Sequence, residues 1–343
     1  MSDQVPVASP HSKKPLATAL RVLLIIIGVI IGLVLGLLLI GQLRPLQLNE
    51  LNVNPAPIND YDEAVRRAQA LVEADKANTS LNPDCSSRYL SQGKRTERVL
   101  VIRHGLTNCP RQFDALASEY YARGYTVLIA RIPQHGYADR KSTQAGTLTA
   151  EETLTDFSEW VDIAHGLGEK VDLMGLSVGA NEVAVLASQR GDIDQAILMN
   201  PFFGIKGVPS FMTRSVTGVS LTLPNMFLWW DRQAKENLAG PTSAYYGFYT
   251  HVIGQYLRMT AFLKDKPMEA KQLIVITNGN DDAVNNGVTD DFIQQWRELG
   301  ENVTTYRFPE SDKLNHDMID PMQPDARIDV AYPKILELTT QNE

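Results

Sequence analysis

A serine flanked by glycines marks the part of the chain where chemistry is most clearly indicated, the stretch GLSVG at residues 175–179. A β-branched apolar run precedes the stretch and a helix-like segment follows it, so the serine falls on a turn between a strand and a helix. The glycines leave room for a strained turn that exposes the Ser177 hydroxyl, and the N-terminus of the following helix would stabilise negative charge beside it. The pattern predicts that Ser177 is a nucleophile and not an ordinary turn residue.

A serine hydroxyl is a weak nucleophile until a base removes its proton, and the chain has six histidines. His316 is the expected base, because it follows the last predicted strand in the loop SDKLNHDMID, from which it can reach the ends of the strands. The other five lie in less suitable places, before an N-terminal apolar run, in earlier loops, in a predicted helix or in a long insertion: His11, His104, His135, His165 and His251.

The base needs a carboxylate that fixes its tautomer and stabilises the imidazolium. The segment ITNGNDDAVNN (276–286) follows a predicted strand and offers two adjacent aspartates. The spacing of Asp282 from the preceding glycine and the following valine favours it as the catalytic acid, and Asp281 is the alternative. The resulting chain order of serine, aspartate and histidine is that of α/β-hydrolase triads.

An oxyanion that forms on the substrate needs N–H donors, and removal of one such donor costs about a hundredfold or more in rate. The amide of Val178 is one predicted donor. The other is the amide of Leu106, in the loop RHGLTNCP (103–110) after the first long strand. The predicted substrate pocket comprises His104, Gly105, His135, Phe227, Trp229 and Trp230.

These residues must be positioned by a sheet, and short apolar runs alternate with helical patterns from residue 98 onward. Several of the predicted strands are apolar throughout, as strands buried on both faces of a parallel sheet are. The alternation predicts a doubly wound α/β fold, in a catalytic domain that we expect to span residues 85–343. The predicted strands cover 99–103, 126–131, 171–175, 195–200, 272–278 and 303–308. Residues 201–270 interrupt the alternation with aromatic clusters and are expected to form a cap over the strand ends, the alternative being extra helices on the flank of the sheet.

The N-terminal part differs from the rest, because residues 22–41 are free of charged side chains. As a helix this run would be about 30 Å long, the thickness of a bilayer's hydrocarbon core. A cleaved signal peptide is the alternative, but the run is longer than is usual for one and no good cleavage site follows, so we expect a retained transmembrane helix. More basic residues precede the run (Lys13, Lys14, Arg21) than follow it (Arg44), which predicts a cytoplasmic N-terminal segment (1–21) and a periplasmic or extracellular catalytic domain.

Three glycines within this run, Gly28, Gly32 and Gly36, share one helix face and predict a dimerisation surface, although glycine is common in membrane helices. Residues 42–84, in which prolines are followed by a helical pattern, are expected to form a stalk and a lead-in helix.

The chain has two cysteines, Cys85 and Cys109. An oxidising compartment would permit a disulfide between them that closes about 24 residues and contributes on the order of 3 kcal/mol. Two unrelated buried thiols are the alternative. A bridge would brace the loop that carries Leu106.

From about Cys85 onward the sequence resembles an α/β-hydrolase of the bacterial carboxylesterase and monoacylglycerol-lipase type. The segment HGLTNCPRQFDALASEYYARGYTVLIARIPQHG is similar to that group's oxyanion loop, first helix and next strand, although Gln134 replaces the usual glycine. GLSVGA, GNDDAV and NHD match the group's nucleophile, acid and base motifs in order. The resemblance implies ester hydrolysis through an acyl-enzyme, without metal or organic cofactor.

The expected function is therefore a membrane-anchored serine hydrolase that acts on short-to-medium acyl or monoacylglycerol-like esters. An acyltransferase, thioesterase or peptidase could use the same triad, and a non-catalytic binding protein of the same fold is the alternative from another class. The formal net charge of −8 and the absence of a dense Lys/Arg cluster argue against nucleic acid as a partner.

Overall fold

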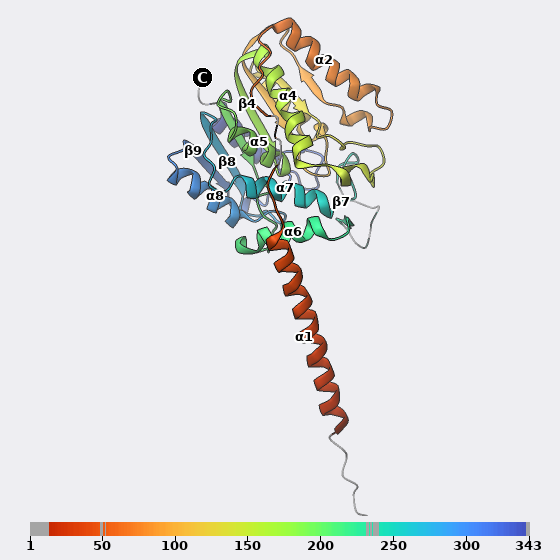
Figure 1. Ribbon diagram of the computed structural model, residues 1–343. Helices are drawn as coiled ribbons and strands as arrows, with labels where there is room; N and C mark the ends of the chain where they lie inside the picture. Colours follow the sequence, from red (N-terminus) through yellow and green to blue (C-terminus); the bar gives the residue numbers. More distant parts are fainter. Residues whose placement is uncertain are drawn as a thin grey trace, which may run out of the picture.

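The computed structural model describes residues 14–48, 51, 53–230, 233, 235 and 240–340. His11, Lys13 and most of the predicted cytoplasmic segment lie outside these ranges. A long N-terminal helix projects from a domain in which helices cover both faces of a central sheet (Figure 1).

The central sheet has seven strands in the order β1-β3-β2-β4-β5-β8-β9, and only β1 runs antiparallel to its neighbour. Their bounds are β1 (Arg88–Leu90), β2 (Thr96–Arg103), β3 (Thr126–Ala130), β4 (Gly168–Leu176), β5 (Gln195–Met199), β8 (Gln272–Asn278) and β9 (Val303–Phe308). The sheet confirms the predicted α/β class and contains all six predicted strands. Strand β1 was not predicted, because three residues give no usable periodicity.

The strands end together, which sets where the functional loops emerge. Arg103 at the end of β2 lies opposite Gly175 in β4, and Leu176 in β4 lies opposite Met199 in β5. Because the parallel strands are in register, the loops after β2, β4, β5, β8 and β9 all leave the same edge of the sheet.

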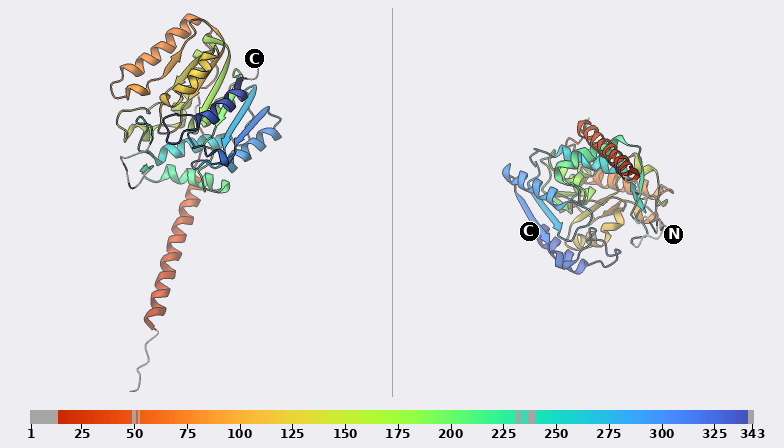
Figure 2. Two further views of the ribbon diagram at one scale, coloured as in Figure 1. Left: turned by 180° about the vertical axis from the view of Figure 1, so that it is seen from behind. Right: turned by 90° about the horizontal axis from the view of Figure 1, so that it is seen from below.

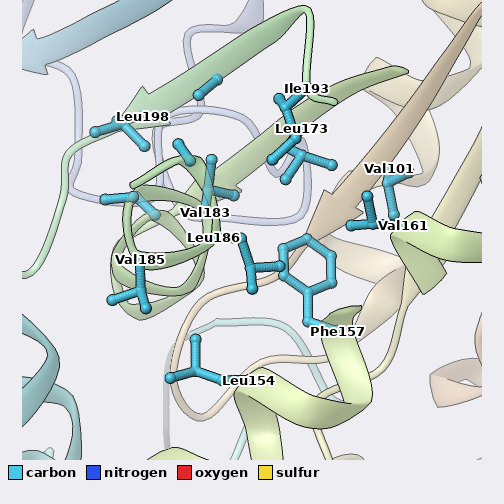
Figure 3. Close-up of a cluster of buried hydrophobic side chains, with 14 of the residues drawn as sticks. Val101, Leu154, Phe157, Val161, Leu173, Val183, Val185, Leu186, Ile193 and Leu198 are labelled. Carbon is cyan, nitrogen blue, oxygen red and sulfur yellow. The ribbon is translucent and has the colours of Figure 1, made fainter. Parts of the chain in front are cut away.

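Alternate strand residues pack into two separate cores, one on each face of the sheet. On one face, Leu100 and Ile102 of β2 pack with α3 (Asp114–Ala122) and α9 (Ile328–Thr340). On the other face, Val99 and Val101 pack with a larger set of helices. That set comprises α2 (Tyr61–Ala77), α4 (Ala150–Leu167), α5 (Val178–Ala187), α7 (Thr250–Phe262) and α8 (Asn286–Glu298). Figure 3 shows part of this core, with Val101 near Val161 of α4.

The insertion between β5 and β8 lies over the edge where the strands end. It contains α6 (Thr213–Thr222), the short hairpin of β6 (Phe227–Trp229) and β7 (Gly247–Tyr249), and α7. The amide of Tyr245 donates to the carbonyl of Thr107 (2.7 Å), and the indole of Trp230 donates to the Thr107 hydroxyl (3.2 Å). The insertion is therefore fastened to the loop that follows β2.

The N-terminal helix α1 (Lys14–Leu43) extends away from the domain (Figures 1 and 2). Its residues Thr18–Leu43 are long and apolar enough to cross a membrane, and it is the one such helix in the described part of the chain. A Cβ placed on Gly28, Gly32 or Gly36 would meet no atom within 4 Å, so this glycine face is open.

The segment after α1 does not separate helix and domain as a free stalk would. Leu46 and Val53 are buried, and the Ile58 amide donates to the Asp162 carbonyl (2.9 Å). Asp60 then caps α2 by accepting from the Glu63 amide (2.7 Å), and α2 packs on α4. Leu46 and Val53 of the expected stalk thus pack on the domain, and α2 lies where the lead-in helix is expected.

Candidate active site

Ser177 occupies a strained turn between β4 and α5. Its φ of 58° and ψ of −119° lie in a region that non-glycine residues rarely adopt. The neighbouring glycines are required by close backbone contacts, because a Cβ on Gly175 would overlap the backbone of Gly179, and a Cβ on Gly179 would overlap the Arg103 carbonyl. The turn is held further by the Ser177 amide, which donates to the Met199 carbonyl (2.9 Å).

His316 meets Asp281, not Asp282. The Nδ1 atom of His316 lies 2.7 Å from Oδ2 of Asp281. The other carboxylate oxygen of Asp281 accepts from the amides of Ala283 and Val284 (2.9 and 3.0 Å), which fixes the side chain in the turn after β8. Asp282 is exposed and lines the cavity beside them. The prediction that Asp282 contacts the base is therefore wrong, and the alternative residue has that position.

The two side chains adjust each other's ionisation. Burial lowers the pKa of His316, but the adjacent Asp281 carboxylate, together with the charges of Asp317 and Asp282, raises it by more, and the net pKa lies above the usual value. Burial raises the pKa of Asp281, but His316 and the two backbone donors outweigh this effect and hold it below the usual value. Because an ionised carboxylate only accepts hydrogen bonds, Nδ1 of His316 carries a proton. In the neutral imidazole, Nε2 then has the free lone pair that a general base needs.

Two asparagines hold the His316 loop against the sheet. The Asn200 side-chain amide, directly after β5, donates to the His316 carbonyl (2.8 Å). The Asn278 side-chain amide, at the end of β8, donates to the carbonyls of Leu314 and Asn315 (2.7 and 3.0 Å). Neither asparagine was predicted to be functional, and the signal that could have identified them is a polar side chain at the end of an otherwise apolar strand.

The loop after β2 brings Leu106 to the cavity that Ser177 and Val178 also line. His104 holds this loop from behind. Its Nε2 accepts from the Ile132 amide (3.0 Å), so Nδ1 is protonated and donates to the Gly105 carbonyl (2.9 Å). Burial lowers the pKa of His104 well below its usual value, in keeping with a neutral structural ring.

A disulfide between Cys85 and Cys109 ties the segment before β1 to the same loop. Both cysteines are buried. At the other side of the loop, the Gln112 side chain accepts from the Gly105 amide (2.8 Å) and donates to the Asp317 carboxylate (2.7 Å). The loop of Leu106 is thus connected through Cys85 to the segment between α2 and β1, and through Gln112 to Asp317, the residue after His316.

The cavity has a volume of about 810 Å³ and is lined by Ser177, Asp282 and His316 as well as by the insertion. Its apolar lining includes Phe202, Ile205, Val216, Leu228, Trp230, Phe248 and Ile253. Its polar lining includes Asn108, Gln112, Lys206, Ser220, Asn315, Asp317 and Gln323. The arrangement combines space for an acyl chain with polar groups close to the reactive side chains.

Of the predicted pocket residues, Gly105 and Trp230 line this cavity, whereas His104, His135, Phe227 and Trp229 do not. Phe227 and Trp229 were assigned to the pocket wrongly because they lie in β6, where successive side chains point to opposite faces. Leu228 and Trp230 face the cavity, whereas the rings of Phe227 and Trp229 pack against each other at 5.1 Å. His135 is buried, with Nδ1 3.1 Å from the Pro133 carbonyl, and its ring stacks on Tyr245. Among the described residues no group of three or more His, Cys, Asp or Glu could hold a metal ion.

Comparison with known proteins places this arrangement in context. Residues 98–304 match the family model described as the alpha/beta hydrolase fold. A thermostable monoacylglycerol lipase of Bacillus sp. (strain H-257) is 29% identical over 124 residues, which are 34% of this chain and 44% of the lipase. The chain thus matches less than half the length of that relative.

Solved structures share the fold at low sequence identity. A structure described under LipS and LipT, two metagenome-derived lipolytic enzymes, has a TM-score of 0.58 at 16% identity and covers 75% of this chain and 98% of its own. The monoacylglycerol lipase of Paleococcus ferrophilus has a TM-score of 0.55 at 14% identity, with the same two coverages. A soluble variant of the Saccharomyces cerevisiae monoglyceride lipase has a TM-score of 0.53 at 14% identity and covers 74% and 90%.

Proposed function

Because the chain belongs to the α/β-hydrolase fold family, we propose that it is a membrane-anchored serine hydrolase that cleaves carboxylic esters. The observation that carries the proposal is the hydrogen bond of 2.7 Å between His316 and Asp281, beside a cavity that Ser177 lines from a strained turn. A strained nucleophile, an oriented base and a buried acid are the parts that acyl transfer through serine requires.

In the proposed reaction, Oγ of Ser177 attacks the ester carbonyl while Nε2 of His316 takes the hydroxyl proton. Asp281 stabilises the resulting imidazolium, and the amides of Leu106 and Val178 donate to the oxyanion. His316 returns the proton to the departing alcohol as the carbon–oxygen bond breaks, which leaves an acyl-enzyme. Water then attacks the acyl group by the same steps in reverse, which releases the acid and restores Ser177.

The proposed substrates are esters of short-to-medium acyl chains or monoacylglycerol-like lipids. The apolar lining residues of the cavity are suited to an acyl chain, and its polar lining residues are suited to an alcohol group with hydroxyls. The relative from Bacillus, a monoacylglycerol lipase, supports the same substrate class.

In the proposed topology α1 is retained as the anchor, with the N-terminus in the cytoplasm and the catalytic domain on the periplasmic or extracellular side. Two observations support the proposal, namely the exposed apolar surface of α1 and the disulfide, which is typical of an oxidising compartment. The open face of Gly28, Gly32 and Gly36 is a proposed surface for a second copy of α1.

Hydrolysis of p-nitrophenyl esters of graded chain length by the full chain in detergent tests the proposal, with Ser177→Ala as the control. We expect turnover that requires Ser177 and depends on chain length. An acyltransferase, thioesterase or peptidase would share the first half-reaction, so added alcohols, thioesters and amides as alternative substrates separate these activities. A folded protein that neither hydrolyses these esters nor reacts with a fluorophosphonate would instead be a binding protein.

A further inference from the structure

The C-terminal end of α1 crosses the insertion helix α6 with the two backbones in contact. A Cβ on Gly41 would overlap the carbonyl of Ser215, and a Cβ on Gly218 would overlap the backbone of Gly41. Both positions therefore require glycine, and the crossing is of the close type that small residues permit. Figure 1 shows α1 leaving the domain directly beneath α6.

Polar contacts lock this crossing. The Arg214 guanidinium donates to the carbonyl of Gln42 (3.1 Å), one of the carbonyls that the end of α1 leaves unpaired. The Ser215 hydroxyl donates to the Gln42 side chain (3.0 Å), and the Arg44 guanidinium donates to the Thr222 hydroxyl (3.1 Å). Helix α1 is thus joined to α6 at the crossing and is not suspended on a flexible linker.

Helix α6 also forms part of the cavity wall. Val216 and Ser220 line the cavity from the same helix that contacts α1. Beside α6, Phe211 is 83% exposed and Met226 is 49% exposed. Trp230 lines the cavity and is nevertheless 48% exposed, so it marks a place where the cavity reaches the surface.

The length of α1 determines how far α6 and the exposed residues beside it lie from the centre of a bilayer. The uncharged run of residues 22–41 corresponds to about 30 Å of helix, and its last residue is the glycine that contacts α6. Helix α6 then lies where hydrocarbon meets headgroups. Exposed aromatic side chains together with Arg44 and Arg214 suit that region, in which tryptophan and arginine are common.

We infer that α1 is a structural part of the insertion between β5 and β8, and that it holds α6 and Trp230 on the lipid surface. Acyl substrates then enter the cavity directly from the bilayer. The inference rests on the proposed function of a membrane-anchored ester hydrolase. The partner of this surface is a lipid bilayer, and the anchor determines which substrates the enzyme reaches.

The first test compares two substrates in full-length protein reconstituted into phosphatidylcholine vesicles. Gly41→Leu places a side chain in the crossing, whereas Leu39→Phe adds bulk two residues away, on another face of α1 that is exposed. We expect Gly41→Leu to lose at least tenfold in hydrolysis of a monoacylglycerol within the vesicle and less than twofold on soluble p-nitrophenyl butyrate. Leu39→Phe is expected to retain both activities.

Two results would overturn the inference: Gly41→Leu hydrolysing the vesicle lipid normally, or losing both activities in equal proportion. A failure of the proposed function is distinct, because Ser177→Ala would then retain turnover of the soluble ester.

A second measurement keeps α1 intact. A fluorophore on Phe211→Cys is compared with one on Leu299→Cys. Leu299 is exposed at the C-terminal end of α8, away from the edge of the sheet where the cavity lies. Nitroxide-labelled lipids are expected to quench the first label at least twofold more than the second, and equal quenching would contradict the inference.

Discussion

The imidazole of His316 lies 2.7 Å from the carboxylate of Asp281, while the adjacent Asp282 is exposed and lines the cavity. Of these two adjacent aspartates, Asp281 is therefore buried against the histidine and Asp282 is exposed. The backbone explains it, because two amides of the turn after β8 bind the Asp281 carboxylate and leave its second oxygen directed at His316.

Asp281→Asn should reduce kcat by about ten-thousandfold, the loss measured for the corresponding change in a serine protease. The amide cannot act as the charged acceptor that fixes Nδ1 as the protonated nitrogen. Asp282→Asn, the matched control, should cost less than tenfold. Steady-state kinetics on one soluble ester compare the two, and the opposite ranking would assign the acid role to Asp282.

The pH dependence of kcat/KM should have its acidic midpoint above 6.5, the ordinary pKa of histidine, because Asp281 raises the pKa of His316. The base acts in its neutral form, so turnover rises as the pH passes upward through that pKa. In Asp281→Asn the midpoint of the residual activity should move to lower pH. An unchanged midpoint in the variant would mean that the titrating group is not His316.

The pKa shifts of His316 and Asp281 also determine how the folding stability depends on pH. The raised pKa of His316 contributes stability at low pH that is lost as the pH rises through the folded-state value. The lowered pKa of Asp281 contributes stability at neutral pH that is lost as the pH falls through its folded-state value. The stability difference between wild type and Asp281→Asn should therefore be greatest between the two folded-state pKa values. It should shrink as the pH rises above that of His316 and as the pH falls below that of Asp281, as measured by denaturant unfolding at several pH values.

Replacement of Cys85 and Cys109 by alanine should destabilise the domain by on the order of 3 kcal/mol, since the bridge closes 24 residues. The loop of Leu106 loses its brace, so kcat should fall more than KM rises. Calorimetry and kinetics with and without reductant measure both effects, and reductant should not affect the double variant. Two free thiols in protein denatured without reductant would exclude the bridge.

Side-chain alternation in β6 yields a prediction about acyl-chain length. Leu228→Trp should shorten the range of accepted esters, because Leu228 faces the cavity and the larger ring fills it. Trp229→Leu should leave the chain-length profile unchanged, because Trp229 packs on Phe227 outside the cavity. Relative kcat/KM over a p-nitrophenyl ester series gives the profile, and a shift in the Trp229 variant alone would reverse the assignment of the two faces.

The sequence predicted those features that depend on local pattern. The sheet was predictable because several of its strands are apolar on both faces. The turn of Ser177 was predictable because a glycine lies two residues before it and another two residues after it. Asp281 could not be chosen over Asp282, because the decision depends on two backbone donors in a turn. The pocket was misassigned at Phe227 and Trp229, because a three-residue strand does not show which face it buries.

The contact between Gly41 and Gly218 could not be predicted from the sequence, for a different reason. The two residues lie on helices far apart in the chain, and nothing in the sequence distinguishes Gly41 from the other glycines of the apolar run or indicates its partner. The packing of the expected stalk was not predictable for a similar reason, since isolated apolar residues such as Leu46 and Val53 do not reveal the surface on which they pack.

The central claim is that Ser177 forms the acyl-enzyme, and covalent labelling tests it most directly. Full-length protein is treated with a fluorophosphonate, digested and analysed by mass spectrometry. We predict a single adduct on the peptide that contains Ser177, loss of ester turnover in proportion to labelling, and no adduct in a folded Ser177→Ala variant. An adduct on another residue, or undiminished turnover in Ser177→Ala, would contradict the account.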